Sequence, residues 1–305
     1  RAGGGVVMSD VLARILARPG ETLAEHSLRV LDRVDQLASL RPLPNFPALY
    51  PRLRWAALLH DSGKLARGFQ RGLRSRKARW GLRHEVLSLA FLNWIDLPEG
   101  DALWVCAAIA THHRDASFIL NHYRRDSTLE ALIAELEPES VRAWYHWLHE
   151  HAPDPTRMRP LCAPTISPMR EALKTLDIWF RALQAEGPAH PDFAQAVLLR
   201  GSLIQADHAA SAGARAFSPQ RWTTPPQPAG TPYPHQQQCA DAGDAEVLLI
   251  APTGSGKTEA ALLWAGEGAP RLFYALPYRA SMNAMAHRLS AFAPPQEVGL
   301  QHGRA

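Results

Sequence analysis

The sequence predicts a protein of two parts: an all-α domain over residues 1–217 and the start of an α/β domain over residues 233–305. Apolar residues recur at helical spacing through the first part, which predicts helices packed on one another. A proline-dense stretch, residues 218–232, then predicts a linker. Beyond it, a short apolar segment, a glycine-rich turn and a second periodic segment indicate an α/β unit. A chain of 305 residues, 46% of them hydrophobic, is long enough for two cores.

The periodicity of the first part places its helices in order along the chain. It predicts helices over 21–40, 53–60, 83–94, 101–113, 127–150, 167–185 and 191–211. Thr22 or Glu21 supplies a start for the first helix, and Ser62 with Gly63 ends the second. Glycines break the pattern over 62–83, so we expect a loop or short helices there. No segment before residue 215 alternates as a strand does, so we expect no sheet in this part.

Histidines and aspartates that can ligate metal fall on these predicted helices or at their ends. Neutral imidazole offers a nitrogen lone pair, and a carboxylate can bridge two cations because it has two oxygens. Contiguous His112 and His113 would point about 100° apart on a continuing helix, so we expect the helix to end there. A single histidine is more often a packed or surface residue, and the set carries the inference. The sequence therefore predicts a metal centre formed by His26, His60, Asp61, His84, His112, His113 and Asp207.

Four further histidines are interpreted as ordinary packing residues. His146, His149 and His151 lie among aromatic side chains near a predicted helix end, and His122 stands alone. We expect no metal role for them.

Positive charge is concentrated in one segment of the chain. Residues 62–83 hold eight basic side chains and no acid, whereas the net charge of the whole chain is only +4. Phe69 and Trp80 lie among these arginines, a combination that grips single strands through phosphate contacts and base stacking. We therefore expect nucleic-acid contacts from Arg67, Arg71, Arg74, Arg76, Lys77 and Arg79.

The second part carries a phosphate-binding pattern. The string APTGSGKT at 251–258 stands between a predicted strand at 246–251 and a predicted helix, and a second strand is predicted at 271–276. Backbone N–H groups of 254–257 would cradle phosphates, Lys257 would reach the β and γ phosphates, and Thr258 would bind Mg²⁺. The sequence thus predicts ATP binding with Mg²⁺, and the loop residues involved are Thr253, Gly254, Ser255, Gly256, Lys257 and Thr258.

Several strings together resemble a known family. The histidine and aspartate order resembles the HD metal-dependent phosphohydrolase superfamily, and LLHDSGKLARGFQ at 58–70, RHEVLSLAFL at 83–92 and ADHAAS at 206–211 resemble the nuclease domain of the type I CRISPR helicase-nuclease. The loop at 251–258 is similar to motif I of superfamily 2 helicases, residues 275–289 to motif Ia, and Gln236 to the adenine-reading glutamine.

The resemblance implies roles and partners. His26, His60, Asp61 and Asp207 would hold one metal, and Asp61 with His84, His112 and His113 the second, while Lys64 would contact the scissile phosphate or stabilise its developing charge. It implies an HD nuclease domain, with single-stranded DNA preferred for endo- or exonucleolytic cutting, and the start of a RecA-like lobe. In the full-length protein it implies a 3′ to 5′ helicase and a guide-RNA surveillance complex of the Cascade type as partner.

Two other functional classes stay open at this point. An HD nucleotidase or phosphodiesterase acting on small nucleotides needs only the first part, and a non-catalytic adaptor would use the phosphate loop for binding alone. Imidazole-rich ligation favours two divalent ions of Mn, Fe, Co or Ni over Mg. No DExH or DExD segment follows Lys257, so we expect a truncated first helicase lobe and no efficient ATP hydrolysis by this length of chain.

The chain offers no membrane signal. No run approaches the roughly 20 apolar residues that cross a bilayer, and Cys106, Cys162 and Cys239 stand in no metal-ligand spacing, as is typical of a reducing compartment. We expect a soluble cytoplasmic monomer that contacts no membrane.

Overall fold

The computed structural model describes residues 10–75, 80–213, 230–243, 245–266, 272–291 and 298–300. The chain divides into two compact units, Arg1–Phe217 and Ser218–Ala305. Some predictions lie outside the described residues: the role of Arg76, Lys77 and Arg79, positions 218–229 of the predicted linker and position 271 of the second predicted strand. Within the described part, no helix is both long and apolar enough to span a membrane.

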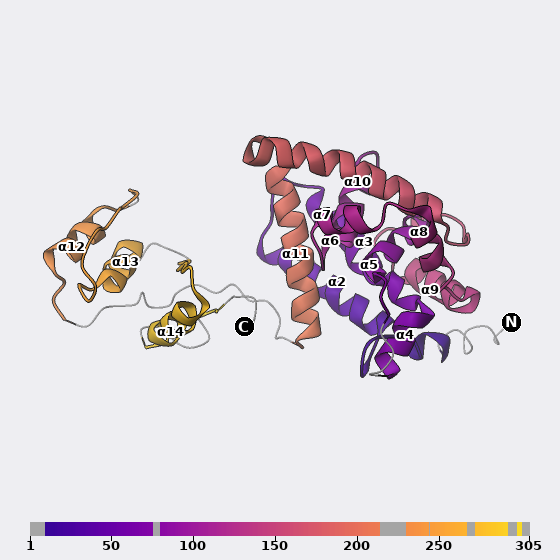
Figure 1. Ribbon diagram of the computed structural model, residues 1–305, viewed down its shortest axis with the longest axis horizontal. Helices are drawn as coiled ribbons and strands as arrows, with labels where there is room; N and C mark the ends of the chain where they lie inside the picture. The colour runs from indigo at the N-terminus through magenta and orange to yellow at the C-terminus, as the bar shows by residue number, and fades with distance from the viewer. Residues whose placement is uncertain are drawn as a thin grey trace. The chain divides into compact units, whose positions relative to one another are not determined.

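The first unit is a bundle of helices, as predicted, with one small hairpin at its start (Figure 1). The hairpin pairs Leu16 with Thr22 in antiparallel register, and Gly20 at its turn has φ +84°. This hairpin corrects the expectation of no sheet, because strands this short show no alternation and form through pairing alone. The elements are β1 Leu16–Arg18, β2 Glu21–Thr22, α2 Leu23–Leu40, α3 Leu49–Leu59, α4 Arg67–Arg74, α5 His84–Ser88, α6 Asp101–Thr111, α7 Ala116–His122, α8 Asp126–Ile133, α9 Pro138–His151, α10 Ile166–Glu186 and α11 Phe193–Ser211.

The core lies between α2, α3, α6 and α11. Helix α2 packs against α3 and α11, and α3 packs against α6. Val30, Leu53, Ile109 and Leu203, one from each helix, are fully buried. Because apolar burial stabilises these contacts by about 25 cal/mol per Å², the four helices hold one another firmly at the place where the candidate ligands converge.

Helix ends follow the predicted signals at two places and depart from them at a third. Thr22 caps α2 and forms a capping box with Glu25. Helix α3 ends at Leu59, directly before the His-Asp pair. The predicted helix over 127–150 is instead two helices, α8 and α9, because Pro138 cannot donate a hydrogen bond and begins the second one.

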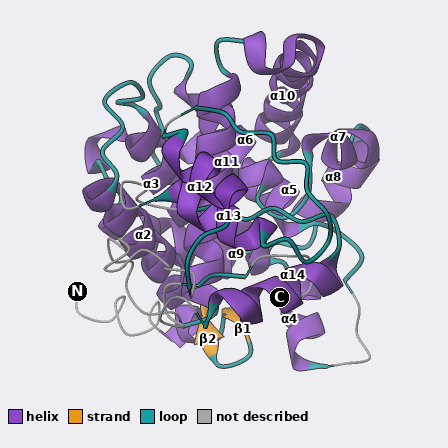
Figure 2. Cartoon of the chain, turned by 90° about the vertical axis from the view of Figure 1, so that its left-hand side faces the viewer, coloured by secondary structure: helices purple, strands orange, loops and turns teal. Residues whose placement is uncertain are grey.

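The second unit contains α12 Pro234–Asp241, α13 Lys257–Ala265 and α14 Arg279–Leu289. The helix predicted after the glycine-rich turn is confirmed by α13. The two predicted strands are wrong for the described residues: 246–250 and 272–276 form no strand, and Figure 2 shows strands only at β1 and β2. A strand requires a neighbour that pairs its N–H and C=O groups, and Leu248, Ile250 and Phe273 stay 87%, 88% and 85% exposed.

Candidate metal centre and phosphate loop

All seven predicted ligands come together in the first unit. They reach one place from five segments: His26 from α2, His60 and Asp61 from the end of α3, His84 from the start of α5, His112 and His113 from the end of α6, and Asp207 from α11. Their ligand atoms form two groups, each within 4.8 Å: one of His26, His60 and Asp207, and one of Asp61, His84, His112 and His113. His113 is the exposed member.

Two of the histidines are oriented by the backbone of their own helices. His60 Nδ1 lies 2.8 Å from the Ala57 carbonyl oxygen, and His112 Nδ1 lies 2.7 Å from that of Ile109. A carbonyl can only accept, so each Nδ1 carries the proton. The Nε2 lone pair of each ring is therefore left to face the cluster.

Asp61 stands between the two groups and turns one oxygen to each. Its Oδ2 lies 3.3 Å from His26 Nε2 and 3.3 Å from His60 Nε2. Its Oδ1 lies 3.0 Å from His84 Nε2 and 3.8 Å from His112 Nε2. One carboxylate is thus placed to serve both groups at once.

The cluster fits the chemistry of bound cations. Asp61 Oδ1 and the Nε2 atoms of His26, His60, His84 and His112 are buried without a hydrogen-bond partner, and the other Asp61 oxygen is held by Lys64. Burying polar atoms unpaired costs free energy, and folded proteins contain few of them. Five such atoms converge in one place, and carboxylate oxygen with imidazole nitrogen is a ligand set that divalent ions bind.

Protonation in the cluster follows its charges. Burial alone would lower the pKa of His26, but the carboxylates of Asp207 and Asp61, 3.2 and 3.3 Å from its Nε2, raise that pKa to about 9. Burial raises the pKa of Asp61, yet His60 and Lys64 outweigh burial and hold that pKa well below its usual range. Burial, with His112 and His84 nearby, lowers the pKa of His113 to about 3. His113 is therefore neutral and able to ligate at physiological pH.

The turn after Asp61 is tightly fixed. The Ser88 hydroxyl accepts from the Gly63 N–H at 2.9 Å and lies 2.7 Å from the His60 carbonyl oxygen. A Cβ at Gly63 would overlap the His84 carbonyl oxygen, so this contact requires glycine. The Lys64 ammonium, the predicted phosphate contact, lies 2.6 Å from Asp61 Oδ2. The turn thus links the His60-Asp61 pair to the helix that carries His84, through the Ser88 hydroxyl and the close approach of Gly63 to the His84 carbonyl.

The two aromatic residues of the basic segment contact the domain core. Phe69 packs edge-on against Trp80 and His84, with ring centroids 5.8 and 5.5 Å apart, and both Phe69 and Trp80 pack against the core. Both rings are only partly buried, and base stacking on them stays a prediction. Arg67 and Arg74 each donate to a backbone carbonyl, and with Arg71 they are exposed.

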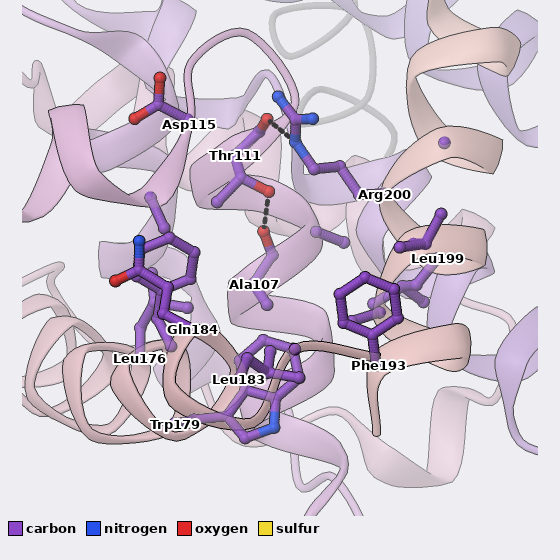
Figure 3. A pocket seen from close by; sticks show the side chains of 17 residues that line it. Ala107, Thr111, Asp115, Leu176, Trp179, Leu183, Gln184, Phe193, Leu199 and Arg200 are labelled. Carbon is purple, nitrogen blue, oxygen red and sulfur yellow. Dashed lines mark hydrogen bonds between the residues drawn. The ribbon is translucent and has the colours of Figure 1, made fainter. Parts of the chain in front are cut away.

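A separate apolar pocket of about 580 Å³ lies between α6, α10 and α11 (Figure 3). Its lining includes Trp179, Leu183 and Phe193 and none of the seven predicted ligands. At its edge, Arg200 of α11 donates from Nε to the Thr111 carbonyl oxygen at 2.9 Å. This hydrogen bond ties the helix that carries Asp207 to the last turn of the helix that ends at His112.

The phosphate loop has the backbone of a turn that requires glycine. Gly254 and Gly256 have φ of +83° and +78°, and Lys257 begins α13. Thr258 is buried in that helix, while Thr253 and Ser255 lie in the loop before it. The Lys257 ammonium donates to the carbonyl oxygens of positions 251 and 252, at 2.9 and 2.8 Å, so it spans the loop where phosphate oxygens would lie.

Gln236 braces this loop from outside. Its side chain is buried, its Nε2 donates to the Gly256 carbonyl at 3.0 Å, and its Oε1 accepts from the Tyr233 N–H at 2.8 Å. In this arrangement both ends of the predicted adenine-reading amide bind protein.

The four further histidines considered in the sequence, His122, His146, His149 and His151, lie against aromatic rings. The His151 ring stacks on Trp147 with ring centroids 4.7 Å apart, and the His122 ring stacks on Phe118 with ring centroids 4.1 Å apart. His146 and His149 lie against Tyr145. None of the four belongs to a metal-type group among the described residues.

Several residues that support the cluster were not predicted from the sequence. Glu21 and Glu85 are buried carboxylates beside His26 and His84, and Ser88 and Arg200 hold the turns described above. Glu85 could have been suspected because it directly follows a candidate ligand. Nothing in the spacing marks Glu21, which precedes the helix that carries His26.

Comparisons with known proteins match both units. A family model described as HD domain matches residues 23–136, and one described as DEAD/DEAH box helicase matches residues 233–303. A putative CRISPR-associated nuclease/helicase Cas3 of Myxococcus xanthus is 31% identical over 98% of this chain and 46% of its own length. A CRISPR-associated nuclease/helicase Cas3 of Methanothermobacter thermautotrophicus is 24% identical over 83% of this chain and 36% of its own length. The chain therefore spans less than half the length of these curated relatives.

Among solved structures, a Cas3 HD domain protein of Methanocaldococcus jannaschii matches with a TM-score of 0.42 and 14% identity, covering 63% of this chain and 98% of its own.

Proposed function

Because the chain belongs to the family of CRISPR-associated nuclease/helicase proteins named Cas3, we propose that residues 1–217 are a metal-dependent deoxyribonuclease domain. We further propose residues 218–232 as linker and 233–305 as the N-terminal part of a RecA-like helicase lobe. The observation that carries the nuclease is the convergence of Asp61 Oδ1 and four histidine Nε2 atoms, all buried and without a hydrogen-bond partner. Neither a structural core nor an adaptor surface needs such a cluster.

Each ligand has a role in this proposal. His26, His60 and Asp207 with Asp61 Oδ2 would hold one divalent ion, and His84, His112 and His113 with Asp61 Oδ1 the other. Bound there, Mn, Fe, Co or Ni would neutralise charge on the phosphodiester and lower the pKa of water, so that hydroxide is available to attack the phosphorus. The bonds of His60 and His112 to backbone carbonyls keep their Nε2 lone pairs aimed inward.

Lys64 supports the same charge distribution. Its ammonium lies 2.6 Å from Asp61 Oδ2 and stabilises the negative charge of that buried carboxylate. Once other cations neutralise Asp61, this ammonium would turn to the scissile phosphate and stabilise the charge that develops there.

The test is cleavage of circular single-stranded DNA, which offers no ends. We expect nicking that requires Mn²⁺ or Ni²⁺ and stops on chelation. Asp61→Asn should lower the rate by more than about 100-fold, since residues that merely support metal ligands already contribute 10- to 100-fold. Asp96→Asn, which removes an exposed acid paired with Arg159, is the matched control and should cut normally.

Two results would contradict this function. Normal cutting by Asp61→Asn would exclude the cluster as the site. Hydrolysis of mononucleotides without any cutting of DNA would identify a nucleotidase instead.

The basic segment is the proposed DNA contact, together with motif Ia at 275–289. Arg67, Arg71, Arg74, Arg76, Lys77 and Arg79 would bind phosphates, and the partly buried rings of Phe69 and Trp80 would stack on bases. Replacing Arg74, Arg76 and Lys77 by glutamate should weaken DNA binding and reduce the slope of log K against log salt by roughly 2 to 3. An unchanged slope would remove this segment from the interface.

For the full-length protein we propose ATP binding at the loop 251–258 with Mg²⁺, 3′ to 5′ movement on one DNA strand and recruitment by a guide-RNA surveillance complex. The support is the match of residues 233–303 to a DEAD/DEAH box helicase and the names of the relatives.

A further inference from the structure

Two buried glutamates stand behind two of the candidate ligands. Glu21 is 4% exposed and its Oε2 lies 3.6 Å from His26 Nδ1. Glu85 is fully buried and its Oε2 also lies 3.6 Å from His84 Nδ1. In both histidines the opposite nitrogen, Nε2, faces Asp61. Each metal group therefore contains one histidine with a carboxylate at its back.

Arginines hold both carboxylates in place. Arg83 binds Glu85 through Nε, 2.6 Å from Oε1, which leaves Oε2 turned to His84. Arg29 lies 3.1 Å from Glu21 Oε1, and Arg18 contacts Oε2. A buried carboxylate is costly unless it is paired, so these arginines make it possible to keep a full negative charge behind each imidazole.

The other two inward-facing histidines need no such partner. His60 and His112 donate from Nδ1 to backbone carbonyls at 2.8 and 2.7 Å. His26 Nδ1, by contrast, is buried without a hydrogen-bond partner, and the Glu21 carboxylate lies 3.6 Å from it. A shift of about 0.6 Å would bring either glutamate to ordinary hydrogen-bond distance.

We propose that Glu21 and Glu85 are positioning residues, one for each cation site of the proposed nuclease, on whose metal centre this inference rests. Each carboxylate accepts the Nδ1 proton of its histidine. It thereby fixes the tautomer that aims the Nε2 lone pair inward and makes that nitrogen a stronger donor. Glu21 acts through His26 and Glu85 acts through His84.

The first test is cation binding by the whole 305-residue chain, measured by titration calorimetry with Mn²⁺. Glutamine keeps the size of the side chain but removes the charge. Wild type should bind two ions, and Glu21→Gln and Glu85→Gln should each weaken one of them by about 10- to 100-fold. Combined with Asp207→Asn, Glu21→Gln should add little further loss, whereas Glu85→Gln should add its full loss.

The matched control is Asp101→Asn. Asp101 is a largely buried carboxylate, 15% exposed, that pairs with Arg52 at 2.6 Å. It should leave both Mn²⁺ affinities unchanged. If Glu21→Gln and Glu85→Gln lower the thermal midpoint as Asp101→Asn does but keep both affinities, the glutamates only stabilise the fold and the inference is wrong.

A second measurement needs no variant. In wild-type protein loaded with Zn²⁺, long-range ¹H–¹⁵N spectra report the tautomer of each imidazole. His26 and His84 should carry the proton on Nδ1, with the far-downfield proton shift of a bond to carboxylate. An Nε2 proton on either ring would overturn the inference even if no glutamine variant folds. Failure of wild type to bind any cation would instead refute the metal centre itself.

Discussion

Gly63 offers the sharpest test of how the fold positions the cluster. It lies in the turn directly after Asp61, and a Cβ there would overlap the His84 carbonyl oxygen and lie 2.8 Å from the carbonyl carbon. Carbon contacts are normally about 3.5 to 4.0 Å, so the two backbones must separate by about 1 Å. Gly63→Ala should therefore cost about 1 to 3 kcal/mol, or about 2 to 12 °C in thermal midpoint for a domain of this size.

The same shift should disturb the chemistry. Asp61 Oδ1 and His84 Nε2 are 3.0 Å apart on the two backbones that must separate. A displacement of about 1 Å can lower a catalysed rate by about 100-fold. The assay is thermal unfolding and Mn²⁺ titration, followed by nicking of circular DNA.

Gly81→Ala is the control for this substitution. Its Cβ would meet nothing within 4 Å, so it should leave stability, Mn²⁺ affinity and nicking close to wild type. If Gly63→Ala matched Gly81→Ala in all three measurements, the close contact of the two backbones would not hold the cluster together.

Three more outcomes are expected. Arg200→Met should lower the free energy of unfolding by about 1 kcal/mol through loss of the hydrogen bond to the Thr111 carbonyl. Arg181→Met, which breaks only a surface ion pair with Asp177, should lower it by less, and equal effects would contradict a special role for Arg200. Lys257→Ala should weaken the binding of a fluorescent ATP analogue at least about 10-fold, and an unchanged affinity would show that the lysine does not contact the nucleotide. Calorimetry should show that Mn²⁺ at 100 times its Kd raises the free energy of unfolding by about 2.7 kcal/mol. This increase should be absent in Asp61→Asn and after addition of EDTA.

The helices could be predicted from the sequence wherever one face repeats every three to four residues. Helix α2 has both a capping box and an apolar stripe, and its bounds agree with the predicted 21–40 within two residues. The hairpin β1–β2 could not be predicted, because two or three residues carry no period. The strands at 246–251 and 271–276 were predicted from apolar content, which says nothing about whether a neighbour pairs with them.

The candidate ligands could be proposed from residue type and order, but their orientation could not. Sequence spacing cannot tell which oxygen of Asp61 faces which histidine, or that Phe69 and Trp80 pack on each other. Those facts depend on contacts between segments far apart in the chain. Glu21 escaped prediction for the same reason, since its link to His26 forms across a hairpin end and a helix start.

The direction of each helix explains why the histidines are supported differently. A helix leaves its last carbonyls unpaired, and His60 and His112 stand at such C-terminal ends, where Nδ1 can donate to a carbonyl three residues back. His26 and His84 stand in the first turns of α2 and α5, where the N–H groups are the unpaired ones. An imidazole there has no unpaired backbone carbonyl to accept its Nδ1 proton, so a carboxylate has to accept it instead. A site built from both kinds of helix end therefore requires buried glutamates at the N-terminal ends alone.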